Sequence, residues 1–292
     1  MPPPADPPPG SERHSGSRSI RRMGKVSAEE EGLSYGTYLR VPELLSLQSL
    51  LSDPPAHDEL LFIVVHQAYE LWFKELLFEA EAARDRMFAR QPDLARHFLE
   101  RMHVIERVLV EQVPVLETMS PQDFLEFRSN LSPASGFQSV QFREVEFISG
   151  LKSRGFLAHL GDSEDERARL ERRLDEPTLW DAYCDLMGAS GLPMPEDDEA
   201  VRRHSLLAVA RDREKYADLW HLAEGLLTHD ELFSLWRYRH ILMVERQIGS
   251  KSGTGGSSGA SYLRTTLDKR FFPELWDVRN ELTGLAQAEE KA

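Results

Sequence analysis

The chain has 292 residues, 41% of them hydrophobic and 29% charged, which is the balance of a globular protein with enough apolar side chains for a core. Its formal net charge is -14, from 49 acidic and 35 basic residues. Binding to nucleic acid needs clustered Lys and Arg, so this charge argues against DNA or RNA as a partner. The one dense basic run, residues 18–25, lies in the N-terminal tail.

The single cysteine, Cys184, excludes an intrachain disulfide and a thiolate metal cluster. Its apolar sequence neighbours predict a small core residue, and a reducing compartment suits a lone thiol. No segment approaches the roughly 20 apolar residues that span a bilayer. The first ten residues, MPPPADPPPG, do not have the pattern of a secretory signal. We therefore expect a cytoplasmic protein with no membrane contact.

Residues 1–30 are rich in Pro, Gly, Ser and Arg, and a segment of this composition buries too little surface to offset its ordering entropy. We expect a flexible, disordered tail there, followed by a single domain over residues 31–292. Compact structure is expected to begin near residues 33–35.

Helical periodicity then dominates, and alternating β-branched residues are hard to find, so the expected fold class is all-α. Ser120 followed by Pro121 is typical of a helix start, while Pro114 indicates a kink or an end. The expected helices are residues 57–81, 93–116, 120–130, 138–150, 164–174, 177–189, 197–226 and 230–248.

Residues 249–261, GSKSGTGGSSGAS, follow the last of these helices and hold no side chain larger than Lys. Backbone freedom predicts a flexible loop, either a linker or an active-site lid. The loop lacks the Gly-Lys-Ser/Thr of a phosphate-binding loop, and its glycines do not fit G-x-G-x-x-G. It also follows a helix rather than a strand, so nucleotide binding is rejected.

Two histidines lie on apolar helical stripes. His66 shares a helix face with Phe62 and Phe73, which predicts an imidazole in an aromatic lining. His240 projects from a stripe with Trp236, Met243 and Val244, whereas the arginines at 237, 239 and 246 are expected largely off it. From spacing alone, each is more commonly a core histidine with a satisfied hydrogen bond. A lone imidazole in an apolar slot is a poor zinc site but a suitable axial ligand for haem.

Arg128 follows Phe124 and Phe127 in DFLEFR. An arginine beside aromatic residues is either a surface residue with a packed stem or a clamp for a carboxylate. The sequence pattern leaves these two alternatives even.

Six strings resemble the tryptophan 2,3-dioxygenase family and occur in its order, from about residue 33 to residue 285. They are SYGTYL (34–39), HDELLFIVVHQAYELWFKELLFE (57–79), FLEFRSNLSPASGFQSVQFR (124–143), LWRYRHILMVERQIG (235–249), GTGGSSG (253–259) and FFPELWDVRNEL (271–282). The resemblance implies a helical bundle that encloses a b-type haem. It also implies cleavage of the C2–C3 bond of L-tryptophan by O2 to give N-formyl-L-kynurenine, the first step of tryptophan degradation by the kynurenine route.

The resemblance also assigns roles residue by residue. His240 matches the haem iron ligand, and His66 matches the catalytic residue that faces the indole N–H. Arg128 matches the arginine that holds the substrate carboxylate, and Thr254 matches a contact to the ammonium group, which would make residues 249–261 a lid. The remaining implied substrate contacts are Phe62, Phe124, Phe127, Tyr35, Tyr38 and Leu39.

Phe124 departs from relatives that carry Tyr there, so one hydroxyl contact is absent. The last three of those contacts belong to an element that completes a neighbouring subunit's pocket, which implies a homotetramer. Three other functions stay open at this point: a haem-containing oxygen store or gas sensor, an indoleamine 2,3-dioxygenase with a broader indole range, and a helical adaptor without a cofactor.

Overall fold

The computed structural model describes residues 32–160, 163–249, 251 and 259–289. Every regular element in these ranges is a helix and none is a strand, which confirms the all-α class. The chain divides into two compact units, Met1–Leu47 and Gln48–Ala292. The expected tail at residues 1–30 lies outside the described residues.

The N-terminal unit contains two short helices, α1 (Tyr35–Leu39) and α2 (Val41–Leu44). Ser34 caps α1, because its hydroxyl accepts the Thr37 N–H at 3.2 Å while the Thr37 hydroxyl accepts the Ser34 N–H at 2.9 Å. This reciprocal cap satisfies two backbone donors that a helix start leaves open. The first described helix starts at Tyr35, next to the residues 33–35 at which compact structure was expected to begin.

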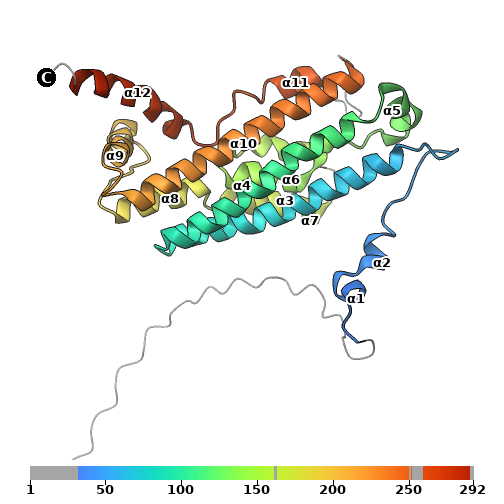
Figure 1. The fold of residues 1–292 in the computed structure, drawn as a ribbon, viewed down its shortest axis with the longest axis horizontal. Helices are drawn as coiled ribbons and strands as arrows, with labels where there is room; N and C mark the ends of the chain where they lie inside the picture. Colours follow the sequence, from blue (N-terminus) through green and yellow to red (C-terminus); the bar gives the residue numbers. More distant parts are fainter. Residues whose placement is uncertain (1–31, 161–162, 250, 252–258, 290–292) are drawn as a thin grey trace, which may run out of the picture. The chain divides into compact units, whose positions relative to one another are not determined.

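Three long helices form the centre of the second unit: α3 (Glu59–Phe88), α4 (Pro92–Glu117) and α10 (Ala217–Ile248). Figure 1 shows them side by side, and α4 packs against both of the others. Pro114 lies one turn before the end of α4 and does not interrupt it. Their shared core consists of fully or nearly fully buried apolar side chains, among them Leu76, Ala83, Leu99, Met102, Leu109, Leu222, Leu226 and Phe233.

Shorter helices cover this centre, and most begin at a hydroxyl side chain that caps the first turn. Ser120 accepts the Asp123 N–H at 3.2 Å, as its position before Pro121 predicted. These helices are α5 (Pro121–Arg128), α6 (Val140–Ile148), α7 (Glu164–Asp175), α8 (Leu179–Ala189) and α9 (Glu199–Arg211). Near the C-terminus follow α11 (Ala260–Arg264) and α12 (Pro273–Glu289), which the sequence analysis did not predict. Among the described helices, none is both long and apolar enough to cross a membrane.

The predicted boundary between helices 197–226 and 230–248 is wrong. The chain breaks earlier, between Arg211 and Ala217, where the Asp212 carboxylate accepts the Lys215 N–H at 3.1 Å and forms a turn. The helix α10 then continues through residues 226–230 because the polar side chains His229 and Asp230 are buried and have partners inside the fold. Tertiary contacts therefore keep the helix continuous through these buried polar residues.

Candidate active site

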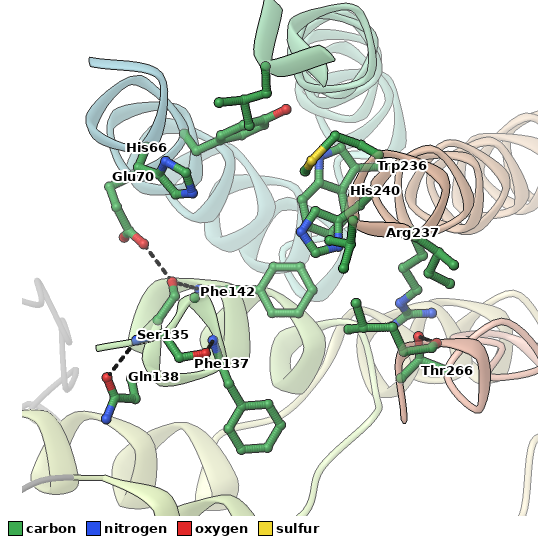
Figure 2. Close-up of a pocket in the computed structure, with 18 of the residues that line it drawn as sticks. His66, Glu70, Ser135, Phe137, Gln138, Phe142, Trp236, Arg237, His240 and Thr266 are labelled. Atoms are coloured by element: carbon green, nitrogen blue, oxygen red, sulfur yellow. Dashed lines mark hydrogen bonds between the residues drawn. The ribbon is translucent and has the colours of Figure 1, made fainter. Parts of the chain in front are cut away.

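A cavity of about 590 Å³ opens between helices α3, α6 and α10. This volume falls in the range of about 300–1,000 Å³ that small-molecule sites occupy. Figure 2 shows His66 and Glu70 on one side of the cavity and Trp236 and His240 on another. The lining includes Phe62, His66, Tyr69, Glu70, Phe73, Phe124, Phe142, Trp236, Arg237, His240, Ile241, Met243 and Val244.

The helix α3 contributes His66, whose Nδ1 lies 2.7 Å from the carbonyl oxygen of Phe62. A carbonyl only accepts hydrogen bonds, so Nδ1 carries the proton. Burial lowers the pKa of His66, although the bond to Phe62 and the charge of Glu70 act in the opposite direction. The ring is therefore neutral at pH 7, and its Nε2 is a hydrogen-bond acceptor. The satisfied Nδ1 agrees with a core histidine, while the place of His66 in the cavity lining agrees with a site residue.

The helix α10 contributes His240, which Figure 2 shows across the cavity from His66. Burial, together with a smaller contribution from the nearby His66, lowers the pKa of His240 to about 4. The Trp236 ring stacks on the imidazole with centroids 5.1 Å apart and planes 9° from parallel. Among the described residues, no side chain or carbonyl forms a hydrogen bond with the His240 ring. An imidazole that is half-buried, neutral and without such a bond has a nitrogen lone pair available to a ligand in the cavity.

Phenylalanines form one end of the cavity. Phe62 and Phe124 line it, with their ring centroids 5.7 Å apart. Phe127 is fully buried behind them, 5.6 Å from Phe62 and 5.4 Å from Phe124. Phe127 therefore packs against both of these lining rings, and the described cavity lining does not include it.

The structure does not bring every predicted site residue into this cavity. Arg128 is half-buried in the last turn of α5, directly after Phe127, and lies outside the described lining. Thr254 lies outside the described residues. Tyr35, Tyr38 and Leu39 belong to the N-terminal unit, where their side chains are exposed.

The cavity wall holds an ion-pair cluster that the sequence pattern did not predict. Glu146 on α6 accepts hydrogen bonds from Arg143 at 2.6 Å and from Arg237 at 2.8 Å, and all three side chains are buried. Burial lowers the pKa of the Arg237 guanidinium, which Glu146 opposes. The expectation that Arg237 lies off the apolar stripe is wrong, because its guanidinium turns into the cavity wall where Glu146 neutralises it. The spacing of Arg143 and Glu146, three residues apart on one helix face, is the signal that could have indicated part of this cluster.

Comparison with known proteins decides the family. The family model described as tryptophan 2,3-dioxygenase matches residues 21–179 and 197–282. The chain is 57% identical to the tryptophan 2,3-dioxygenase of a Nocardioides species over 264 residues, which cover 88% of this chain and 98% of that relative. The chain belongs to the tryptophan 2,3-dioxygenase family.

Two more distant relatives of the same name extend the similarity. The family member from Herpetosiphon aurantiacus is 43% identical over 263 residues, covering 86% of this chain and 99% of that protein. The one from Myxococcus xanthus is 42% identical over 266 residues, covering 86% of this chain and 90% of that protein. The resemblance that the six sequence strings indicated is confirmed.

The cavity residues fit the haem that this family suggests. A planar, mostly apolar group with an axial nitrogen ligand needs an apolar slot and one neutral imidazole without a competing bond. His240 supplies the imidazole, and its neighbours Trp236, Ile241, Met243 and Val244 supply apolar walls. Among the described residues, no group of three His, Cys, Asp or Glu side chains could hold a bare metal ion.

Proposed function

We propose that this protein is an enzyme that opens the indole ring of L-tryptophan with O2. Both oxygen atoms enter the product, N-formyl-L-kynurenine, and the C2–C3 bond breaks, so the reaction needs no external electron donor. The observation that carries the proposal is a pair of neutral imidazoles, His66 and His240, in one apolar cavity of a chain from this family.

His240 would hold haem b through its free ring nitrogen. The low pKa of this imidazole favours that role, because a protonated ring has no lone pair to donate. When bound, the haem supplies the site at which O2 is activated, and the protein supplies position and a dry environment. Trp236 stacks on the His240 ring and fixes its plane.

His66 would orient the substrate. Its Nδ1 proton is committed to the Phe62 carbonyl, so the remaining nitrogen can accept the indole N–H and hold the ring at a set angle. The indole nitrogen need not lose its proton for the ring to react, so His66 acts as a hydrogen-bond acceptor rather than an obligatory base. Phe62 and Phe124 would pack against the indole, and Phe127 would support both rings.

Arg128 would bind the substrate carboxylate through its planar guanidinium, and Thr254 would contact the ammonium group. Gly259 lines the cavity, so the segment at residues 249–261 ends at the cavity wall. Gly249 and Gly259 have φ angles of 61° and 67°, a left-handed backbone that favours glycine at both ends of this segment. These features support a lid that closes over a bound amino acid.

We also propose a homotetramer in which Tyr35, Tyr38 and Leu39 of one subunit complete the pocket of another. Their exposed apolar surface within a single chain supports this assembly. A cytoplasmic location agrees with a sequence that has one cysteine, which a reducing compartment keeps as a free thiol.

The deciding experiment incubates the haem-loaded enzyme with L-tryptophan in air and follows N-formyl-L-kynurenine by its near-ultraviolet absorbance. We expect product to accumulate with equal loss of tryptophan and O2. A haem protein that binds O2 reversibly and forms no product would be a gas sensor or store, and would contradict the proposal. Equal rates with tryptophan and with other indole amines would favour the broader indoleamine class.

The variant Arg128→Leu tests the carboxylate contact. The loss of one charged pair weakens substrate binding by roughly 2–5 kcal/mol, with haem content unchanged. The matched comparison uses tryptamine, which lacks the carboxylate and should bind the variant as it binds the original enzyme. An unchanged tryptophan affinity would refute the role of Arg128.

A further inference from the structure

Glu70 lies one turn after His66 on α3 and reaches the same cavity. Figure 2 shows its carboxylate directed toward the segment that carries Ser135, Phe137 and Gln138. One carboxylate oxygen accepts the Ser139 hydroxyl at 2.6 Å, and the other accepts the Gln141 side-chain amide at 2.7 Å. Both oxygens of Glu70 are therefore engaged by residues far away in sequence.

Each of the two donors also has a second structural task. The Ser139 hydroxyl oxygen caps α6 by accepting the Phe142 N–H at 3.2 Å, while its proton goes to Glu70. The Gln141 amide also donates to the backbone carbonyl of Glu70 at 2.8 Å. Glu70 is thus joined to the start of α6 by three hydrogen bonds. The helix α6 carries Phe142 and the buried ion pair of Arg143 and Glu146, and all three side chains line the cavity.

Residues 134–139, here called the wall segment, form one side of the cavity directly before α6. A local turn shapes the segment, since the Ser135 N–H donates to Gln138 at 3.2 Å and the Phe137 N–H donates to Ser135 at 3.3 Å. On its other side, the Phe137 ring packs against the Tyr262 ring, with the ring centroids 5.5 Å apart. The wall segment is therefore attached to α3 through Glu70 at one side and packed by an aromatic contact at the other.

We propose that Glu70 is a positioning residue, which clamps the wall segment to α3 and so sets the distance between that wall and His66. This inference rests on the proposed function, because it assigns the clamp to the fit of the tryptophan ring in the cavity. The carboxylate is suited to the task because it accepts two donors at once, and hydrogen bonds to a charged acceptor are about twice as strong as neutral ones. If the wall segment is displaced, we expect weaker binding of the substrate but little change in the rate of the chemical step.

The test compares three variants of the haem-loaded enzyme. Glu70→Ala removes the clamp, Glu70→Asp keeps the charge but shortens the reach, and Glu70→Gln keeps the length and can re-form part of the network. The matched control is Glu75→Gln, which changes the same residue type on the exposed side of α3. We expect Glu70→Ala and Glu70→Asp to raise the Kd and KM for L-tryptophan by about tenfold, with kcat changed less. Glu70→Gln should lie between Glu70→Ala and the original enzyme, because its uncharged amide has one oxygen that can accept only part of the network, and the control should match the original enzyme.

Two further measurements separate a clamp from general stability. Amide hydrogen exchange of residues 135–143 should be at least about tenfold faster in Glu70→Ala, while the haem content and melting temperature stay near those of the original enzyme. A lower melting temperature with an unchanged Kd in the remaining folded protein would show a merely structural role and overturn the inference. Unchanged exchange and unchanged Kd would overturn it as well. If the original enzyme binds no tryptophan, the proposed function fails, and the exchange rates still decide whether Glu70 clamps the wall.

Discussion

Helix α10 holds a buried histidine and a half-buried one in opposite settings. His229 lies in the sealed core, with Nδ1 2.5 Å from Glu106 and Nε2 2.8 Å from the Ser149 hydroxyl. His240, three turns later, lines the cavity and forms no hydrogen bond with any described residue. Both ring nitrogens of His229 thus have hydrogen-bond partners, whereas those of His240 have none among the described residues.

Around His229, four groups are linked by consecutive hydrogen bonds: the Val145 carbonyl, the Ser149 hydroxyl, the His229 ring and the Glu106 carboxyl group. Ser149 donates its proton to the Val145 carbonyl at 2.7 Å, so its oxygen accepts from His229 Nε2. One proton is then shared between His229 Nδ1 and Glu106, whose pKa burial raises. Both nitrogens of His229 are used, and the residues described around it leave no opening to solvent.

This difference separates a structural histidine from a site histidine more sharply than burial does. The ring nitrogens of His229 are both bonded, whereas those of His240 line the cavity without a described partner and are open to a ligand. Although Glu106, His229 and Ser149 resemble a nucleophile with its base and acid, the cluster is closed to substrate. It pins α4, α6 and α10 together instead.

The largest expected effect is at His240. The variant His240→Ala should lose the haem Soret band and all tryptophan turnover, because the cavity then has no axial nitrogen near that wall. The apoprotein should keep its helical circular dichroism, since the substitution breaks no hydrogen bond with a described residue. A normal Soret band in this variant would show that the open histidine does not hold the haem.

The core histidine should behave in the reverse way. His229→Ala leaves the buried Glu106 without its partner, and breaking a buried pair of this kind lowers the free energy of unfolding by about 3–5 kcal/mol. Urea unfolding measures this loss. The protein that remains folded should bind haem in the original ratio, and a selective loss of haem without a loss of stability would remove the distinction between the two histidines.

A pH titration gives a smaller effect with a definite sign. In the haem-free protein, where no iron occupies the His240 nitrogen, the pKa values of His103 and His240 are about 4, against an ordinary value of 6.5. As the pH falls below 6.5, these histidines become protonated in the unfolded chain but stay neutral in the folded protein. The free energy of unfolding therefore decreases until the pH reaches about 4. Each histidine contributes at most about 3 kcal/mol over this window. His103→Gln should show a shallower slope in urea unfolding, and an unchanged slope would exclude His103 as a source.

The smallest effect is expected at Ser149. Ser149→Ala removes the hydroxyl that accepts the hydrogen bond from His229 Nε2. The bond between His229 Nδ1 and Glu106, on the other side of the ring, stays in place. A neutral hydrogen bond contributes about 1 kcal/mol, so the free energy of unfolding should fall by about that amount, clearly less than for His229→Ala. If both variants lost the same free energy of unfolding, the hydrogen bond between His229 and Glu106 would contribute nothing to stability.

Part of this architecture follows from the sequence alone. Helical periodicity and hydroxyl caps are local properties, so the all-α class and the cap at Ser120 could be predicted. The apolar stripes around His66 and His240 could be predicted for the same reason. The positions of these two residues in one cavity agree with that pattern.

Other features depend on residues that lie far apart in the chain. The partners Glu106 and His229 are 123 positions apart, and Gln141 and Glu70 are 71 apart. The sequence around residues 226–230 therefore indicated a helix break where α10 is continuous, because its polar side chains are satisfied by another helix.

The sequence by itself determined the all-α class, the family and the two histidine-bearing stripes, since short-range spacing and family strings encode them. Only the tertiary structure decided which histidine is sealed and which is open, and which carboxylates meet the cavity wall. The physical reason is that a buried polar group is stabilised by the partner that packing brings to it, and no local pattern specifies that partner.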